Sequence, residues 1–132
     1  MIAMAVRGIG FDLVSISQFA AQLARPGTLM HRHFTPSERR ACAHAVDGPD
    51  RQYATRWAAK EALIKAWSVS RFGRPQLMSS VDYQDIELIT DNWGRPSLQV
   101  HGAIREYLSD ATIHVSLTHE GDMAGAFVIV EE

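Results

Sequence analysis

The sequence predicts an α+β fold, in which a small antiparallel sheet packs against one long central helix and several shorter helices. Two pairs of strand-like runs are each joined by a short turn-rich segment, which is typical of antiparallel hairpins. Helical stretches interrupt these strands without alternating regularly with them, and this argues against a parallel sheet. At 132 residues, the chain fits a single domain that covers residues 1–132.

The composition is that of a folded protein, with 21% charged and 46% hydrophobic residues. We interpret the apolar start, MIAMAV, as a strand, because Arg7 and Gly8 interrupt it well before the ~20 residues that a membrane span needs. We therefore expect a cytoplasmic protein with no membrane partner. Cys42 is the only cysteine, which excludes an internal disulfide. The formal net charge of −2 argues against nucleic acid as a partner.

The first third of the chain predicts a strand followed by a helix. Residues 6–12, VRGIGFD, have strand character, and Gly8 and Gly10 indicate a bend or a close backbone approach. Ser15 can cap a helix over SISQFAAQLA, which Pro26 and the following glycine end.

Two further helices are expected before the middle of the chain. The segment 35–38, TPSE, has a threonine cap, a proline at the first helical position and a glutamate three residues after the cap. This capping-box pattern opens a short helix, TPSERRACAHA, which the segment VDGPD ends. From about Asp50, a long helix should run to about Trp67 or Ser68.

The second half of the chain begins with a loop and continues with short elements. The stretch SRFGRPQLMSS, which contains Gly73, is longer than a tight turn and is a candidate binding element. The runs IELIT and PSLQV should form a hairpin around DNWGRP, and GAIREYLSD should form a helix. The runs TIHVSLTH and MAGAFVIV should form a second hairpin across EGD.

The long helix carries three charges in the stretch RWAAKEALIKAW. Lys60 falls in the middle of an apolar stripe, while Glu61 and Lys65 stand four residues apart on its border, where they can meet each other. An ordinary interpretation is open: an exposed ion pair worth ~0.3–0.5 kcal/mol, with the stem of Lys60 lying over the core. The stripe consists of Tyr53, Trp57, Ile64 and Trp67.

A second carboxylate, Asp12, ends the first strand next to the glycines. Mg²⁺ commonly receives one or two carboxylates from a protein and fills its other positions with water and phosphate oxygens. A lysine one turn from Glu61 would meet the same phosphates as a point charge. Together these residues suggest diphosphate chemistry, although either carboxylate could also merely cap a turn or face solvent.

Four segments together resemble the family of bacterial holo-acyl-carrier-protein synthases, the small class of 4′-phosphopantetheinyl transferases, and especially its actinobacterial members. GIGFDLVSI resembles the family pattern G-x-G-x-D-x-V-x-I, and FTPSER resembles F-T-x-x-E. RWAAKEALIKAW matches [FW]-[AS]-x-K-E-A-x-x-K-A, and HVSLTHEGDMAGAFVIVEE is similar to the closing hairpin of the family. These segments occur in the expected order from Gly8 to the end of the chain.

The resemblance implies that coenzyme A donates its 4′-phosphopantetheine arm to a serine of an apo acyl carrier protein, or of a carrier domain in a fatty-acid synthase. Adenosine 3′,5′-bisphosphate would leave, and the reaction would serve fatty acid synthesis. The resemblance also implies a homotrimer with coenzyme sites between subunits. An activated water or one of two carboxylates would take the serine proton.

The family motifs assign roles to particular residues. By resemblance, Asp12 and Glu61 hold Mg²⁺, and with Lys65 they form the catalytic set, in which Lys65 offsets charge on the diphosphate. Further coenzyme-binding residues implied by the motifs are Lys60, Arg56, Gly73 and His119.

One departure from the family concerns carrier recognition. Family members often have an arginine six residues after the metal-binding aspartate, where this chain has Gln18. Arg39 and Arg40 could provide a basic surface in its place, or could simply face solvent. Two other functions stay open: a Mg²⁺-dependent phosphohydrolase acting on coenzyme A or another diphosphate, and a carrier-binding module without turnover.

Overall fold

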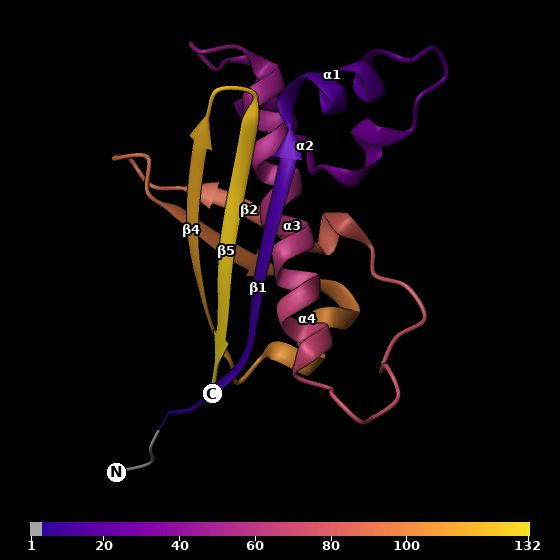
Figure 1. Ribbon diagram of the computed structural model, residues 1–132, viewed down its shortest axis with the longest axis vertical. Helices are drawn as coiled ribbons and strands as arrows, with labels where there is room; N and C mark the ends of the chain where they lie inside the picture. Colours follow the sequence, from indigo (N-terminus) through magenta and orange to yellow (C-terminus); the bar gives the residue numbers. More distant parts are fainter. Residues whose placement is uncertain (1–3) are drawn as a thin grey trace.

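The computed structural model describes residues 4–132, and Figure 1 shows its elements along one face of a sheet. The elements in chain order are β1 (Val6–Ser15), α1 (Ile16–Ala24), the 3₁₀ helix η1 (Met30–His33), α2 (Pro36–Ala43), α3 (Pro49–Val69), the 3₁₀ helix η2 (Tyr83–Asp85), β2 (Ile86–Thr90), β3 (Pro96–Val100), α4 (Gly102–Leu108), β4 (Thr112–Glu120) and β5 (Met123–Glu131). The expected strand over MIAMAV lies partly outside the described residues, and the observed strand starts at Val6.

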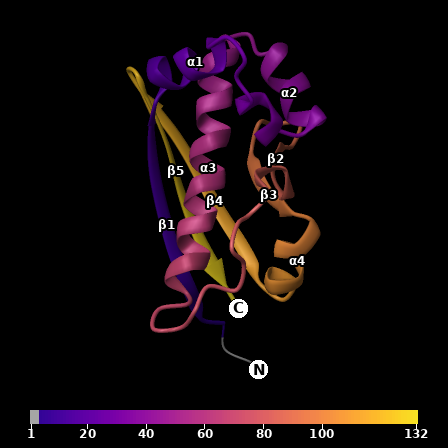
Figure 2. The ribbon, with the colours of Figure 1, turned by 90° about the vertical axis from the view of Figure 1, so that its right-hand side faces the viewer.

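The strands form two antiparallel sheets. One has the order β1-β5-β4 and the other pairs β2 with β3, so both predicted hairpins are confirmed. Helix α3 crosses one face of the three-stranded sheet, while α1 and α2 lie near one end of α3 and α4 near its other end (Figure 2). This arrangement confirms the α+β prediction. The first strand extends three residues beyond its predicted end, to Ser15.

The two glycines of β1 let α3 approach the sheet closely. A Cβ atom on Gly8 would lie 1.8 Å from the carbonyl oxygen of Ala66, and one on Gly10 would lie 1.8 Å from that of Ala62. No side chain fits at these distances, because both obstacles are helix backbone. The close approach predicted from the sequence is therefore confirmed, and it fixes α3 against β1, which carries Asp12.

We expect Gly10→Ala to lower the free energy of unfolding by about 3 kcal/mol, near the upper end of the usual cost of overpacking. The added methyl must push α3 away from β1, since it would otherwise overlap the Ala62 carbonyl. Gly125→Ala is the matched control, because its Cβ would meet the flexible ends of Leu13 and Thr118 at 3.1 and 3.3 Å. In urea unfolding, Gly10→Ala should have a much lower midpoint than Gly125→Ala. Equal midpoints would contradict the close approach of α3 to β1.

The buried surface of α3 is wider than the single stripe that the sequence predicted. Tyr53 and Trp67 are buried as expected, and Trp57 and Ile64 are half-buried. Alanines on a neighbouring face are also fully buried and carry much of the contact with the sheet; they are Ala58, Ala59, Ala62 and Ala66. Alanines contribute little to the pattern of large apolar residues along a helix, so the sequence did not predict this second buried face.

Cys42 lies in a second core cluster with Phe19, Phe34 and Tyr53. Burial raises the pKa of its thiol to about 11, so the thiolate is scarce at neutral pH and the residue acts as a small hydrophobic group. Among residues 4–132, no helix combines the length and the apolar character that crossing a membrane requires.

Candidate active site

Asp12 and Lys65 form an ion pair between β1 and α3. Gly8, Gly10 and Asp12 alternate along β1, so their shared face turns toward the helix. Lys65 Nζ donates to Asp12 Oδ1 at 2.8 Å and to the Phe11 carbonyl at 3.1 Å. The Lys65 side chain is 53% exposed, against 15% for Asp12, so the ammonium can still reach a ligand from solvent.

Glu61 lies one turn before Lys65 on α3, but the two do not form the pair that the sequence suggested. Lys65 instead binds Asp12, and Glu61 Oε1 accepts a hydrogen bond from the Tyr83 hydroxyl at 2.9 Å. The expected contact fails because each residue finds a better placed partner on another element. Asp12 and Glu61 line one cavity of about 290 Å³, together with Gln18, Gln22 and Trp57.

The chemistry of this cavity fits Mg²⁺ held by two carboxylates. Asp12 Oδ1 and Glu61 Oε1 already accept hydrogen bonds, whereas the second oxygen of each carboxylate accepts none from residues 4–132. No cluster of three or more potential ligands among histidine, cysteine, aspartate and glutamate occurs in that part of the chain. The two carboxylates by themselves are the small, oxygen-only donor set that leaves Mg²⁺ free to bind water and phosphate.

Tyr83 is a member of this site that the sequence analysis missed. Its ring centroid lies 4.6 Å from that of Trp57 and 4.9 Å from that of His33, and its hydroxyl reaches Glu61. Burial, aided by the hydrogen bond to Glu61 and the charge of Asp12, raises the Tyr83 pKa to about 12, so the phenol stays protonated and donates at neutral pH. Tyr83 lies on a short 3₁₀ turn outside every recognised motif, and no local pattern marks it.

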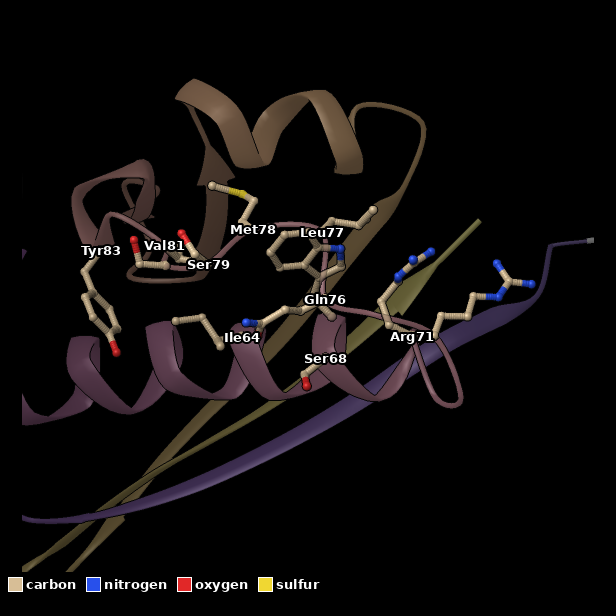
Figure 3. Close-up of a pocket in the computed structure, with 12 residues that line it drawn as sticks. Ile64, Ser68, Arg71, Gln76, Leu77, Met78, Ser79, Val81 and Tyr83 are labelled. Atoms are coloured by element: carbon tan, nitrogen blue, oxygen red, sulfur yellow. The ribbon is translucent and has the colours of Figure 1, made fainter.

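A second cavity, of about 260 Å³, opens beside Tyr83 (Figure 3). The end of α3 and the loop after it form this cavity, with Tyr83 at one end and Arg71 at the other. The walls mix apolar side chains such as Trp67 and Met78 with serines and two arginines. The loop that the sequence marked as a candidate binding element therefore lines a cavity. Gly73, with a φ of +79°, is exposed and lies outside its lining.

Arg56 and His119 line a third cavity, of about 190 Å³, which shares no residue with the Asp12 cavity. His119 is the next-to-last residue of β4 and lies 3.5 Å from the Arg51 guanidinium, measured from Nδ1 to Nη1. Asp12 and His119 are on β1 and β4, the two outer strands of the sheet, which stand roughly 10 Å apart across β5. A single chain therefore does not bring these predicted coenzyme residues together with Asp12.

Arg56 itself is only partly available to a ligand. Its side chain is buried, and Nη1 donates to the Gln52 carbonyl at 3.3 Å and to Gln52 Oε1 at 2.8 Å. The Arg56 Nε is buried without a hydrogen-bond partner within residues 4–132. An unpaired buried donor is costly, and a phosphate oxygen entering this cavity would relieve that cost.

The expectation that Lys60 lies beside coenzyme needs correction. Its side chain is 0% exposed, and Nζ donates to Glu38 Oε1 at 2.8 Å, to the Tyr83 carbonyl at 2.9 Å and to the Ile86 carbonyl. An ammonium has three protons, and all three are used inside the protein. Lys60 is a core residue in this structure, and we do not retain it among the coenzyme ligands.

Comparison with known proteins agrees with this geometry. The family model described as the 4′-phosphopantetheinyl transferase superfamily matches residues 8–128. The chain is 54% identical over 129 residues to a holo-[acyl-carrier-protein] synthase of Mycobacterium sp. (strain KMS), covering 98% of this chain and 99% of the relative. A relative of the same description from Mycobacterium tuberculosis (strain ATCC 25618 / H37Rv) is 53% identical, with 97% and 98% covered.

Solved structures show the same likeness. The acyl carrier protein synthase of Mycobacterium tuberculosis has a TM-score of 0.79 and 50% identity, covering 96% of this chain and 97% of its own. An acyl carrier protein synthase from Chronobacterium ammoniagenes, in complex with coenzyme A, has a TM-score of 0.87 and 39% identity, covering 98% and 97%. The chain therefore belongs to the holo-[acyl-carrier-protein] synthases of the 4′-phosphopantetheinyl transferase superfamily. The resemblance found in its sequence motifs is confirmed.

Proposed function

We propose that this enzyme transfers the 4′-phosphopantetheine arm of coenzyme A to a serine of an apo acyl carrier protein or carrier domain, in the cytoplasm and in support of fatty acid synthesis. The observation that carries the proposal is that Asp12 and Glu61 line one cavity while Lys65 pairs with Asp12, in a chain of this family. In the reaction, the serine oxygen forms a bond to the phosphorus that carries the pantetheine. The bond from that phosphorus to the bridging oxygen breaks, and adenosine 3′,5′-bisphosphate leaves.

The residues of the site have complementary roles in this proposal. Asp12 and Glu61 would hold Mg²⁺, which supplies positive charge to the diphosphate when bound. Lys65 binds a diphosphate oxygen through its half-exposed ammonium and offsets the charge that grows on the leaving bisphosphate. The serine proton goes to a carboxylate of the site or to water. The nucleophile belongs to the carrier, so this chain needs no reactive side chain of its own.

Arg56 and His119 lie apart from Asp12 and Glu61. This separation supports a coenzyme site that a neighbouring subunit completes, as in the expected homotrimer. Arg56 and His119 lie on one side of α3 and the Asp12 cavity on the other, so residues from two chains could flank one coenzyme molecule. The outer face of β1 would suit a subunit contact, because Ile9, Phe11 and Leu13 are each about half exposed there. Light scattering of the purified protein should give three times the chain mass, and a monomer mass would refute the shared site.

Carrier recognition would rely on local basic residues. Gln18 faces the cavity of Asp12 and Glu61 and cannot attract an acidic carrier by charge. Arg40 on α2 is exposed and Arg39 is half-buried, with Nη1 donating to the His31 carbonyl at 3.4 Å. These arginines would give a carrier association that weakens as salt is added.

Mass spectrometry of several apo-carriers, incubated with the enzyme, Mg²⁺ and coenzyme A, tests the proposed function. The modified carrier should gain the mass of one phosphopantetheine group. Coenzyme A hydrolysis at a rate unaffected by carrier would favour the phosphohydrolase. Carrier binding without any mass gain across the carriers would favour a module that has lost turnover.

We expect Lys65→Ala to weaken coenzyme A binding or slow transfer much more than it lowers stability. The exposed ion pair with Asp12 should contribute at most about 1 kcal/mol to folding. Arg95→Ala is a matched control, because it removes an exposed pair with Asp91 on the β2–β3 turn. Steady-state kinetics and melting temperatures should separate the two variants. Normal kinetics together with a large fall in the melting temperature of Lys65→Ala would show that the pair is only structural.

A further inference from the structure

Tyr83 is held in place at three points. Its hydroxyl donates to Glu61 Oε1 at 2.9 Å, and its backbone carbonyl accepts from the buried Lys60 Nζ at 2.9 Å. Its ring packs against the rings of Trp57 and His33, which also contact each other. A side chain fixed at its backbone, its ring and its hydroxyl presents that hydroxyl in one defined place, so it can orient whatever accepts its hydrogen bond.

Glu61 is the residue that gains from this. A glutamate side chain has several rotatable bonds and loses up to about 2 kcal/mol of conformational entropy when it is fixed. The Tyr83 hydroxyl lowers this cost before any ligand arrives, because it fixes Oε1 of a side chain that lines the cavity shared with Asp12 and leaves Oε2 without a hydrogen-bond partner among residues 4–132. Groups that hydrogen-bond a metal-binding carboxylate set its direction in this way.

We propose that Tyr83 is a positioning residue for Glu61, which sets the direction of its free carboxylate oxygen toward the divalent cation. The proposal rests on the proposed function in one respect only, namely that Glu61 holds the cation. It also gives the buried lysine a part in the site: Lys60 does not touch coenzyme but anchors the backbone of the tyrosine that orients Glu61.

Tyr83 links two cavities. It borders the cavity of about 260 Å³ next to the loop after α3, and its hydroxyl contacts a residue that lines the Asp12 cavity. Figure 3 shows its side chain directed back toward α3, from the segment that follows the loop. A ligand that fills the loop-side cavity would press on the same ring that orients the metal-binding glutamate.

Tyr83→Phe tests the proposal, since it removes the hydroxyl and keeps the ring against Trp57 and His33. Mn²⁺ binding is followed without carrier through the electron paramagnetic resonance of the free ion, with coenzyme A present and a coenzyme-only blank subtracted. We expect the affinity for Mn²⁺ to fall about 10- to 100-fold. In the transfer assay, the Mg²⁺ concentration that gives half the maximal rate should rise by a similar factor. Tyr107→Phe is the matched control, because that tyrosine is exposed and packs against Trp67, away from Glu61.

A double-mutant cycle separates positioning from a general structural effect. In a Glu61→Gln background, Tyr83→Phe should cause no further loss of Mn²⁺ affinity, because the carboxylate to be oriented is already gone. Equal additional loss in both backgrounds would overturn the proposal. So would unchanged metal affinity of Tyr83→Phe at a temperature where circular dichroism shows the variant folded.

The outcome for the proposed function is read separately. Wild-type enzyme that binds Mn²⁺ through Glu61 but transfers nothing to any carrier would refute the transferase while leaving the positioning role intact. If the wild-type enzyme transfers normally and the Tyr83→Phe variant has normal metal affinity, the positioning role is refuted and the transferase is not.

Discussion

Glu61→Gln should abolish transfer and leave the fold intact. Glutamine is a comparable helix former, and its amide oxygen can still accept the hydrogen bond from the Tyr83 hydroxyl. The substitution removes one of the two negative charges that would hold Mg²⁺ against the diphosphate. Loss of a residue that merely supports a metal ligand typically costs about 10- to 100-fold, so loss of a ligand itself should reduce the rate by at least about 100-fold.

The measurement is the initial rate of carrier modification at saturating coenzyme A and Mg²⁺, beside the melting temperature. Glu106→Gln serves as the matched control, since it makes the same chemical change at an exposed position of α4. The control should keep wild-type activity. A Glu61→Gln enzyme that transfers at the normal rate would remove Glu61 from the catalytic set and leave its contact with Tyr83 as a structural one.

Local signals in the sequence were enough to predict the α-helices and strands of the fold, but not its two 3₁₀ helices. The capping box at the start of α2 forms as expected: Thr35 Oγ1 accepts from the Glu38 amide at 3.1 Å, and Glu38 Oε1 accepts from the Thr35 amide at 2.9 Å. Such patterns involve residues within one turn, so their spacing predicts their contacts. The glycines of β1 were also informative, because a residue without a side chain allows another backbone to approach closely.

Interactions between distant segments were not accessible in this way. The carboxylate of Glu38 serves the capping box and also binds Lys60 and the amide of Leu88. Helical spacing suggested that Glu61 and Lys65 would pair, but their actual partners, Tyr83 and Asp12, are 22 and 53 positions away. The family motif marked Lys60 as important without showing that its contacts are with Glu38 and backbone carbonyls inside the core.

We expect Lys60→Met to lower the free energy of unfolding by about 3–5 kcal/mol, the usual cost of removing one partner of a buried ion pair. Methionine fills similar space but leaves the Glu38 carboxylate, only 1% exposed, without its cation. The carbonyls of Tyr83 and Ile86 lose a donor in the same step. Burial lowers the pKa of Lys60, and the charge of the Glu38 carboxylate opposes that effect and favours the ammonium.

Urea unfolding of three variants tests whether the unpaired charge is the cause. Lys60→Met with Glu38→Gln should be more stable than Lys60→Met alone, because glutamine buries no charge and its one oxygen still accepts from the amide of either Thr35 or Leu88. Lys65→Met, at an exposed site on the same helix, should cost at most about 1 kcal/mol. If the double variant is no more stable than Lys60→Met, lost packing explains the effect better than the charge.

The double variant also distinguishes stability from positioning. Removing the Glu38 charge can restore folding, but it cannot return a donor to the Tyr83 carbonyl, which Lys60 supplies. Its metal affinity should therefore stay below that of the wild type even where its stability recovers. Recovery of both together would mean that the buried pair supports the site only by keeping α3 folded, and that Tyr83 holds its place through its ring contacts alone.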